Sequence, residues 1–376
     1  MDALTNEQNL FRESVEKFLT AKYDFARRRK AIASNNGWDR NLWREWAEMG
    51  WFSASLPEKF GGLGGGWVEE TILHEAFGAC LVIEPYLSLL ALPRAVILKH
   101  GSESQQDKYL SAMAAGKLAI AMALNDSNER HGTDSRGTIA IKGNGCWKIS
   151  GSKSPVLGAP LADLLIVSAS FPESDNSAAL FFVETNAPGV QLREYTTIDG
   201  QLAADVTLDG ATATTDAMLG TPVDARSAIE FVFDYAAAAS SIEAVGAMTA
   251  AVRMTGEYVK IRRQFGQVIG KFQVIQHRLA DMLMELEYAR SIAYCAMSNL
   301  AAEDGVRARS VSGAKVYISK AAKFVGAQAV QLHGAIGMTD ECAISHYFRK
   351  LAVYDLMWGD ARYHLGRYTA LSREAR

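Results

Sequence analysis

Cysteine and proline are scarce in this chain of 376 residues, which contains four cysteines and eight prolines. The cysteines are Cys80, Cys146, Cys295 and Cys342, and they form no CxxC pair and no cluster with histidine. A disulfide framework or a structural zinc site is therefore not expected, and unpaired cysteine is typical of a reducing, cytoplasmic location. The later histidines fall singly in helical stretches, which argues against a metal site as well.

The chain also lacks a strong excess of charge and long apolar runs. Lys and Arg number 39 against 42 Asp and Glu, and the resulting net charge of −3 does not favour nucleic-acid binding. No run approaches the ~18 apolar residues of a membrane span, and the acid-containing N-terminus does not resemble a secretion signal. Hydrophobic residues make up 49% of the chain, which excludes global disorder and can fill the cores of two or three domains.

The hydrophobic period changes twice along the chain. Helical spacing prevails up to about residue 118, interrupted by a glycine-rich turn at 61–66 that has no phosphate-binding spacing. Short runs of β-branched residues follow, such as 164–167 and 179–183, each bounded by Gly, Pro, Asp or Asn. From about residue 224 helical spacing returns, most clearly from Phe272 to Leu286.

These patterns predict an α+β fold of three domains. We expect an N-terminal helical domain at 1–118, a middle antiparallel β domain at 119–222 and a C-terminal four-helix-bundle domain at 223–376. Strands and helices do not alternate, so a Rossmann sheet is disfavoured. The stripe from Phe272 to Leu286 suits either a subunit interface, in a dimer or a tetramer, or the core within the chain.

Three separated motifs resemble segments of the flavin-dependent acyl-CoA dehydrogenase family. RRQFGQVIGKFQ at 262–273 resembles the family's RxxFGxxIGxFQ, and QLHGAIGMT at 331–339 resembles its QxxGGxG segment. MGW at 49–51 with LPEKFGG at 56–62 resembles its GW…PExxGG signature. The helix–β–helix order also matches the family, so the resemblance covers essentially the whole chain. Within the family, the likeness is greatest to small subunits of heteromeric enzymes, such as the pimeloyl-CoA dehydrogenase small subunit.

The resemblance implies an FAD-dependent oxidoreductase that dehydrogenates an acyl-CoA thioester, in fatty acid or steroid catabolism, as a homo- or heterotetramer. In that reaction a carboxylate takes the α proton while a hydride passes from the β carbon to the flavin. The base therefore needs a water-poor cleft that raises its pKa. The electron acceptor that the resemblance implies is an electron-transfer flavoprotein.

The same resemblance assigns residues to the adenine and pyrophosphate end of FAD, which two neighbouring subunits hold between them in this family. The cofactor-binding residues it implies are Arg262, Phe265 and Gln273 on one helix, with Gln331, Gly334 and Ala335 from another. Arg262 offers fixed donors for a phosphate, and Gly334 allows the backbone to approach the cofactor closely.

The sequence departs from the family in the β-domain segments that contact the flavin ring. The family's TEPxxGSD segment corresponds to 124–134, where Leu124, Asn125 and Ser127 remain as candidate contacts. In the GxKxWITNG segment, the Trp position holds Pro155 and the Thr position holds Leu157. We therefore expect the chain's own flavin-holding face to be weakened.

Both usual positions of the family's catalytic glutamate lack an acid. Trp358 and Ala236 occupy them, and neither side chain accepts a proton. Two carboxylates remain as candidates for the base. Glu243 shares a helical face with Ala236 in an apolar run, so we expect a raised pKa, although it is equally suited to be the buried partner of an arginine or of helix amides. Asp360 lies two residues past Trp358.

Three functions therefore compete. The first is a dehydrogenase acting on a CoA thioester, alone or as a subunit, and the second is a non-catalytic subunit that completes a partner's FAD site. The third, a nucleic-acid-associated relative, is disfavoured by the net charge. The residues that would reach FAD on a neighbouring subunit (the neighbour-directed residues) are retained. Those that would contact the flavin ring (the ring-side residues) and those that would act as the base are replaced. The sequence therefore favours a subunit of a mixed assembly. The acyl group is left open.

Overall fold

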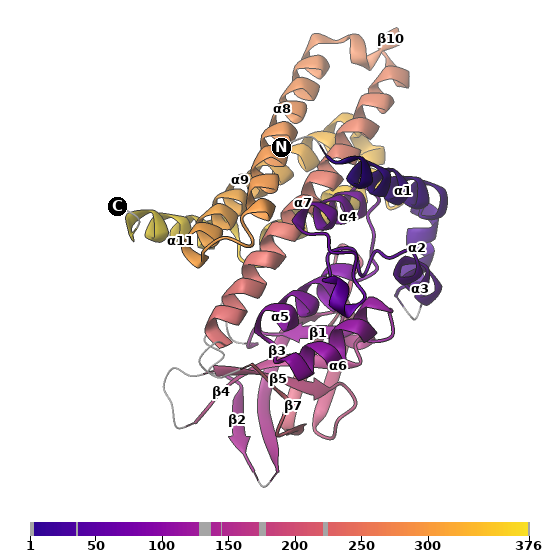
Figure 1. The fold of residues 1–376 in the computed structure, drawn as a ribbon. Helices are drawn as coiled ribbons and strands as arrows, with labels where there is room; N and C mark the ends of the chain where they lie inside the picture. Colours follow the sequence, from indigo (N-terminus) through magenta and orange to yellow (C-terminus); the bar gives the residue numbers. More distant parts are fainter. Residues whose placement is uncertain are drawn as a thin grey trace. The chain divides into compact units, whose positions relative to one another are not determined.

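Helices, then strands, then helices follow one another along the chain, as the change of hydrophobic period predicts. The structure is a computed structural model that describes residues 4–34, 37–127, 137–143, 145–172, 178–220 and 225–374. The chain forms two compact units, drawn in Figure 1. One unit combines Met1–Ala33, Trp67–Val82 and Ala237–Arg376, and the other combines Ser34–Gly66 with Ile83–Ala236. The division into three domains at residues 118 and 222 stays a prediction.

The first unit is helical. Its helices are α1 (Asn6–Lys22), α2 (Phe25–Ala33), α4 (Trp67–Ala79), the part of α7 (Ala225–Ile261) that follows Ala236, α8 (Gln273–Ser298), α9 (Asp304–His333), α10 (Ala343–Leu356) and α11 (Ala361–Glu374). Its short elements are β9 (Arg263–Gln264), β10 (Gln267–Val268), η5 (Ile269–Lys271) and η6 (Gly334–Met338). Helices α8, α10 and α11 all pack on α9, and Figure 1 shows the β9–β10 hairpin joining α7 to α8. This packing on α9 forms the predicted C-terminal helical bundle.

Two glycines bring α4 and α7 into close contact. A Cβ atom at Gly78 of α4 would lie 1.9 Å from the carbonyl oxygen of Glu243, and one at Gly246 of α7 would lie 2.0 Å from that of Glu75. Only glycine fits where two helix backbones approach this closely. The crossing places the polar side chains of α4 against those of α7.

The second unit is built on a sheet. The strands that the structure describes in it are β1 (Ile120–Ala123), β2 (Ile139–Lys142), β3 (Cys146–Leu157), β4 (Leu164–Ser170), β5 (Ala178–Glu184), β6 (Val190–Thr196), β7 (Leu202–Thr214) and β8 (Met218–Leu219). They follow the order β6-β7-β3-β2-β4-β5-β8, and β1 pairs with β4. Most neighbours run antiparallel as predicted, whereas β1 and β2 run parallel to β4. The sheet is therefore mixed.

Helices and aromatic side chains complete this unit. The helical elements are α3 (Arg40–Glu48), η1 (Glu58–Phe60), the π-helical η2 (Leu87–Ala91), α5 (Leu92–His100), α6 (Glu103–Ala114) and η3 (Ala159–Leu161). Part of the core is a row of rings in which Trp43 lies 5.1 Å from Trp38 and 4.4 Å from Phe52. The predicted glycine-rich turn at 61–66 is a loop that links η1 to α4.

Among the described residues, α7 is long and apolar enough to cross a membrane by length and composition alone, contrary to the sequence-based expectation that no run approaches a span. Its most apolar window has a mean hydropathy of 1.2 and is 78% buried within the protein, as in the core helix of a folded domain. The apolar stripe on α8, by contrast, is only partly buried within the chain. Met282 and Leu286 are buried within the chain, while Leu283 is 50% exposed.

Candidate functional site

The first cofactor motif forms a protruding hairpin. The turn between β9 and β10 consists of Phe265 and Gly266, whose φ angles are 52° and 81°. Positive φ at both central residues is the conformation of a type I′ turn, which matches the twist of a two-stranded hairpin. Positive φ is costly for a bulky residue such as Phe265. The turn nevertheless presents this ring to the outside, where it is 92% exposed.

The second cofactor motif ends α9 and continues into η6. Gln331, Gly334 and Ala335 are all exposed. Gly334 has φ 66° and ψ −146°, a conformation that side chains disfavour, and a Cβ there would meet no atom within 4 Å. Within the described residues of this chain, packing does not require glycine at this position. The backbone conformation is what favours glycine there, and it leaves the backbone open to a group from outside.

Exposed apolar side chains lie within or directly beside both motifs. Ile261 is 75% exposed beside the hairpin, and Ile336 and Met338 of η6 are 52% and 69% exposed. Apolar side chains that gather at a surface mark an interaction site. The two motifs are also linked within the unit, because the ring of Tyr258 near the end of α7 stacks on that of His333 at the end of α9.

These exposed groups fit the adenosine and pyrophosphate part of FAD. The guanidinium of Arg262 and the amides of Gln273 and Gln331 are hydrogen-bond donors on exposed residues. The ring of Phe265 is open for stacking, and the backbone at Gly334 is open to close approach. The structure does not test the assignment of these residues, which stays a prediction.

The segment of the β unit that is expected to contact the flavin ring has its polar groups largely bonded within the chain, unlike the exposed groups of the cofactor motifs. Of the predicted contacts, Leu124 is buried, and its carbonyl oxygen accepts hydrogen bonds from Lys153 and Ser168 at 3.0 and 2.9 Å. The hydroxyl of Ser127 bonds to that of Ser152 at 2.7 Å. Asn125 keeps a buried Oδ1 that has no hydrogen-bond partner among the described residues. Residues 128–134 of the same motif lie outside the described residues.

A buried ion pair that the sequence analysis did not identify organises this segment. Lys153 is fully buried, and its Nζ donates to Asp126 at 2.7 Å as well as to Leu124 and Ser168. Asp126 also accepts from the Thr138 hydroxyl at 2.6 Å. All three donors of the ammonium are thus used inside the β unit. The polar groups near β1 are largely bonded to one another, and of the predicted contacts only Asn125, within the described part of the chain, keeps an unbonded side-chain acceptor.

Glu243 lies in a largely buried polar cluster of the helical unit, in which its own side chain is 14% exposed. Its carboxylate is 2.8 Å from Lys350 Nζ on α10 and 3.1 Å from His74 Nδ1 on α4. His74 in turn lies 3.6 Å from Glu70 on the same helix. The cluster therefore joins α4, α7 and α10 through their charges.

The expected rise of the Glu243 pKa is wrong. Burial alone raises the pKa of this carboxyl, but the Lys350 ammonium and the hydrogen bonds from His74 and Lys350 outweigh burial and lower the pKa to about 2. The alternative of a buried ion-pair partner describes this geometry, although the partners are Lys350 and His74 rather than an arginine or helix amides. A carboxylate with so low a pKa is a weak base.

The second base candidate, Asp360, begins a helix. Its Oδ1 accepts the Tyr363 amide at 2.8 Å, which is the bond of an N-cap at the start of α11. Trp358 precedes it with φ 57°, in the left-handed region that bulky residues avoid, and its carbonyl accepts from His364 Nε2 at 2.8 Å. The turn before α11 is thus firmly built around a residue that cannot take a proton.

Lys315 is another buried group that the sequence did not reveal. It lies on α9, and its Nζ donates to the carbonyl of Tyr354 in the last turn of α10. Burial lowers the pKa of Lys315 to about 7. The Asp355 and Asp360 carboxylates raise this pKa but do not outweigh burial. Its partner lies 39 residues away, so no local pattern indicates the pair.

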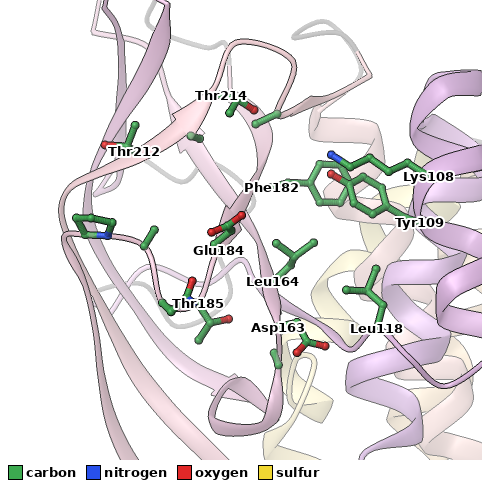
Figure 2. A pocket seen from close by; sticks show the side chains of 16 residues that line it. Lys108, Tyr109, Leu118, Asp163, Leu164, Phe182, Glu184, Thr185, Thr212 and Thr214 are labelled. Atoms are coloured by element: carbon green, nitrogen blue, oxygen red, sulfur yellow. The ribbon is translucent and has the colours of Figure 1, made fainter.

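A separate pocket lies in the β unit and contains none of the predicted site residues. Its volume is about 1130 Å³, and Figure 2 shows Lys108 and Tyr109 of α6 facing Asp163, Glu184 and Thr185 at the strand ends. The hydrogen bond with Tyr109, and then the carboxylates nearby, raise the pKa of Lys108 despite partial burial. The pocket is therefore distinct from the cofactor motifs.

Comparison with known proteins gives consistent matches over the chain. Residues 5–117 match the acyl-CoA dehydrogenase N-terminal domain, and residues 225–369 match the acyl-CoA dehydrogenase C-terminal domain. A probable acyl-CoA dehydrogenase of Bacillus subtilis, YngJ, is 27% identical over 94% of each chain. A subunit of the caffeyl-CoA reductase–Etf complex of Acetobacterium woodii, CarC, is 26% identical over 95% of this chain and 96% of its own.

Solved structures have the same fold. The Tcur3481–Tcur3483 steroid ACAD superposes with a TM-score of 0.87 at 28% identity, covering 98% of both chains. An acyl-CoA dehydrogenase of Geobacillus kaustophilus superposes with a TM-score of 0.90 at 24% identity, again over 98% of both chains. The α+β architecture that the sequence predicts is thereby confirmed.

Proposed function

The chain belongs to the acyl-CoA dehydrogenase family of FAD-dependent oxidoreductases, and we propose that it works as one subunit of an oligomeric acyl-CoA dehydrogenase. In this proposal its hairpin and η6 contribute to an FAD site that a neighbouring subunit completes. FAD, when bound, accepts the hydride from the acyl chain. The residues Arg262, Gln273 and Gln331 of this chain hold the cofactor, and Gly334 lets it approach the backbone.

One contrast carries the proposal. The neighbour-directed residues Arg262 and Phe265 are exposed and unobstructed, whereas the ring-side groups around Leu124 are bonded within the β unit. A hairpin tip that exposes 92% of a phenylalanine in a strained conformation is typical of an interaction surface. The surface is therefore suited to bind a cofactor seated on another chain.

The second candidate function is a subunit that performs no chemistry itself. The observation that favours it is the absence of an available base at both usual positions, together with the low pKa of Glu243. In that case the partner supplies the carboxylate and the flavin-ring face. Asp360 is the remaining candidate within the chain, and its role as N-cap of α11 makes it a poor one.

Two relatives support a mixed assembly. One belongs to a two-component steroid ACAD and another is named as a subunit of a reductase–Etf complex. By analogy we propose a heteromeric assembly, most simply a tetramer, that passes electrons to an electron-transfer flavoprotein in the cytoplasm. A steroid or aryl acyl-CoA thioester is a suitable first substrate to test, beside straight-chain esters.

Counting flavin tests the proposal. The chain is purified alone and together with a candidate partner, a dehydrogenase subunit that retains the complete family motifs, and FAD is measured per polypeptide. We expect little FAD on the lone chain and about one FAD for two chains in the mixed assembly. One tightly bound FAD per chain in the lone protein would contradict the partner-subunit proposal and would point to Asn125 as part of an intact site of its own.

A further inference from the structure

The two segments that carry the predicted FAD residues meet at a pair of side chains. Tyr258 lies one helical turn before Arg262, and His333 directly precedes Gly334. The two rings are stacked, with centroids 4.4 Å apart and planes inclined by 21°. The Tyr258 hydroxyl also donates to the carbonyl of His333 at 3.4 Å.

The imidazole of His333 is held on its own side. Its Nδ1 lies 2.8 Å from the carbonyl oxygen of Ala329, and because a carbonyl only accepts, this nitrogen carries the hydrogen. Burial lowers the pKa of His333 despite that hydrogen bond, so burial favours the neutral form of the ring. A Cβ at Gly337 would lie 2.9 Å from the Cβ of His333, so η6 turns back closely onto the base of this side chain.

Tyr258 is connected to the hairpin through the backbone. Its carbonyl accepts the amide of Arg262 at 2.9 Å, and the carbonyl of Arg262 accepts the amide of Ile269 at 2.8 Å. These two bonds close the hairpin at the residue that is expected to bind phosphate. Tyr258 is thus joined to Arg262 by a backbone hydrogen bond, and His333 is joined to Gly334 directly along the chain.

We propose that Tyr258 and His333 form a clamp that fixes the spacing between the hairpin and η6 for the adenosine end of FAD, a role that rests on the proposed function. Neither residue belongs to the set that the motifs assign to the cofactor, so both are positioning residues. A ligand that contacts two surface segments binds more tightly when their spacing is set beforehand, because less ordering is needed on binding.

The clamp is tested first without cofactor or partner. Amide hydrogen exchange is measured on the full chain for peptides that contain the Arg262 and Ile269 amides and the Gly334 amide. In Tyr258→Leu we expect faster exchange in both segments, whereas Tyr258→Phe, which keeps the stacked ring, stays near wild type. Tyr288→Leu is the matched control, since Tyr288 is 61% exposed on α8 and lies outside both segments.

Cofactor affinity is then measured in the purified mixed assembly by titration with FAD. Loss of an aromatic pair corresponds to about 2- to 12-fold weaker binding, and we expect this increase in Kd for Tyr258→Leu with the melting temperature of the assembly close to that of the control. Should Tyr258→Leu fail to fold, the same measurements are made on His333→Leu, which removes the other ring of the pair. Both variants should affect the same two segments.

Two results would overturn the clamp. One is unchanged exchange at η6 when Tyr258 is replaced, and the other is faster exchange with unaltered FAD affinity. A wild-type assembly that binds no FAD instead contradicts the proposed function, and in that case the exchange measurement still decides whether the two segments are coupled.

Discussion

Lys350 Nζ lies 2.8 Å from Glu243 Oε2 inside the helical unit, and this ion pair explains why an acid set among alanines has a lowered pKa instead of a raised one. Burial by itself destabilises the charged carboxylate, and a nearby ammonium reverses that effect when the two groups are in hydrogen-bonding contact. The pair also ties α7 to α10, the helix that leads to Trp358. Glu243 thus contributes to the structure of the unit.

Replacing Glu243 by Gln is expected to lower the free energy of unfolding by about 1.5–3 kcal/mol, because a charged partner of Lys350 and His74 is removed. Urea denaturation measures the change. Glu257→Gln on the same helix is the matched control, since that side chain is 68% exposed and its pair with Lys260 is on the surface.

The same variant separates packing from catalysis. We expect the rate of flavin reduction in the mixed assembly to remain within a few-fold of wild type. A loss of roughly 10²–10⁴-fold with unchanged stability would instead identify Glu243 as the base.

The contribution of Glu243 to stability should depend on pH in a defined window. The folded pKa is lowered to about 2 from an ordinary value of 4.5, so the unfolded chain binds the proton first as the pH falls. The stabilisation is therefore complete above about pH 4.5 and is lost as the pH decreases towards 2. The charged and titratable groups that face this carboxylate are Lys350 on α10 and His74 on α4, and Glu70 of α4 lies 3.6 Å from the far side of His74.

Urea midpoints of wild type and Glu243→Gln at pH 7, 5 and 3 measure this dependence. We expect the difference between the two proteins to be the same at pH 7 and 5 and to shrink at pH 3. A difference that grows on acidification would mean that the carboxyl is protonated more readily in the folded protein than in the unfolded chain.

The order of helices and strands could be predicted because each element carries its own hydrophobic period, which needs only neighbouring residues. The partners of Glu243 could not, because His74 and Lys350 lie 169 and 107 residues away. The alanines around Glu243 indicated burial correctly, but burial and ion pairing move a carboxyl pKa in opposite directions. Lys153 is a similar case. Its segment could be matched to the family's GxKxWITNG motif, but its buried contacts with Asp126 and Ser168 depend on how β1, β3 and β4 lie together.

The exposure of the side chains in the cofactor motifs could not be predicted from the sequence either. An Arg and a Phe on a predicted helix give no sign that the chain reverses between them in a two-residue turn. The Phe265–Gly266 pair is a hairpin signal only when both residues adopt positive φ. The motif's identity came from its resemblance to a family, and its shape came from the structure.

Replacing Arg262 by Ala should weaken FAD binding to the mixed assembly. A charge-assisted contact with a phosphate contributes about 1.5–3 kcal/mol, so we expect the Kd for FAD to rise about 10- to 150-fold. Arg226→Ala is a suitable control, because Arg226 is likewise exposed, at the start of α7, and pairs only with Glu230 among the ion pairs of the described residues. Full flavin retention at low FAD concentration in Arg262→Ala would remove this residue from the cofactor site.

The lone chain should be a poor dehydrogenase. Without a general base the rate falls by roughly 10²–10⁴-fold, and the bonded ring-side groups around Leu124 give the flavin few partners on the chain's own β unit. Flavin reduction is measured with straight-chain, aryl and steroid acyl-CoA esters, for the chain alone and with its partner subunit. Trp358→Glu places a carboxylate at one usual base position, and we expect it to leave the lone chain inactive because the flavin-ring contacts are still missing. Rapid flavin reduction by lone Trp358→Glu would show that the chain holds FAD by itself and that only the base was lost.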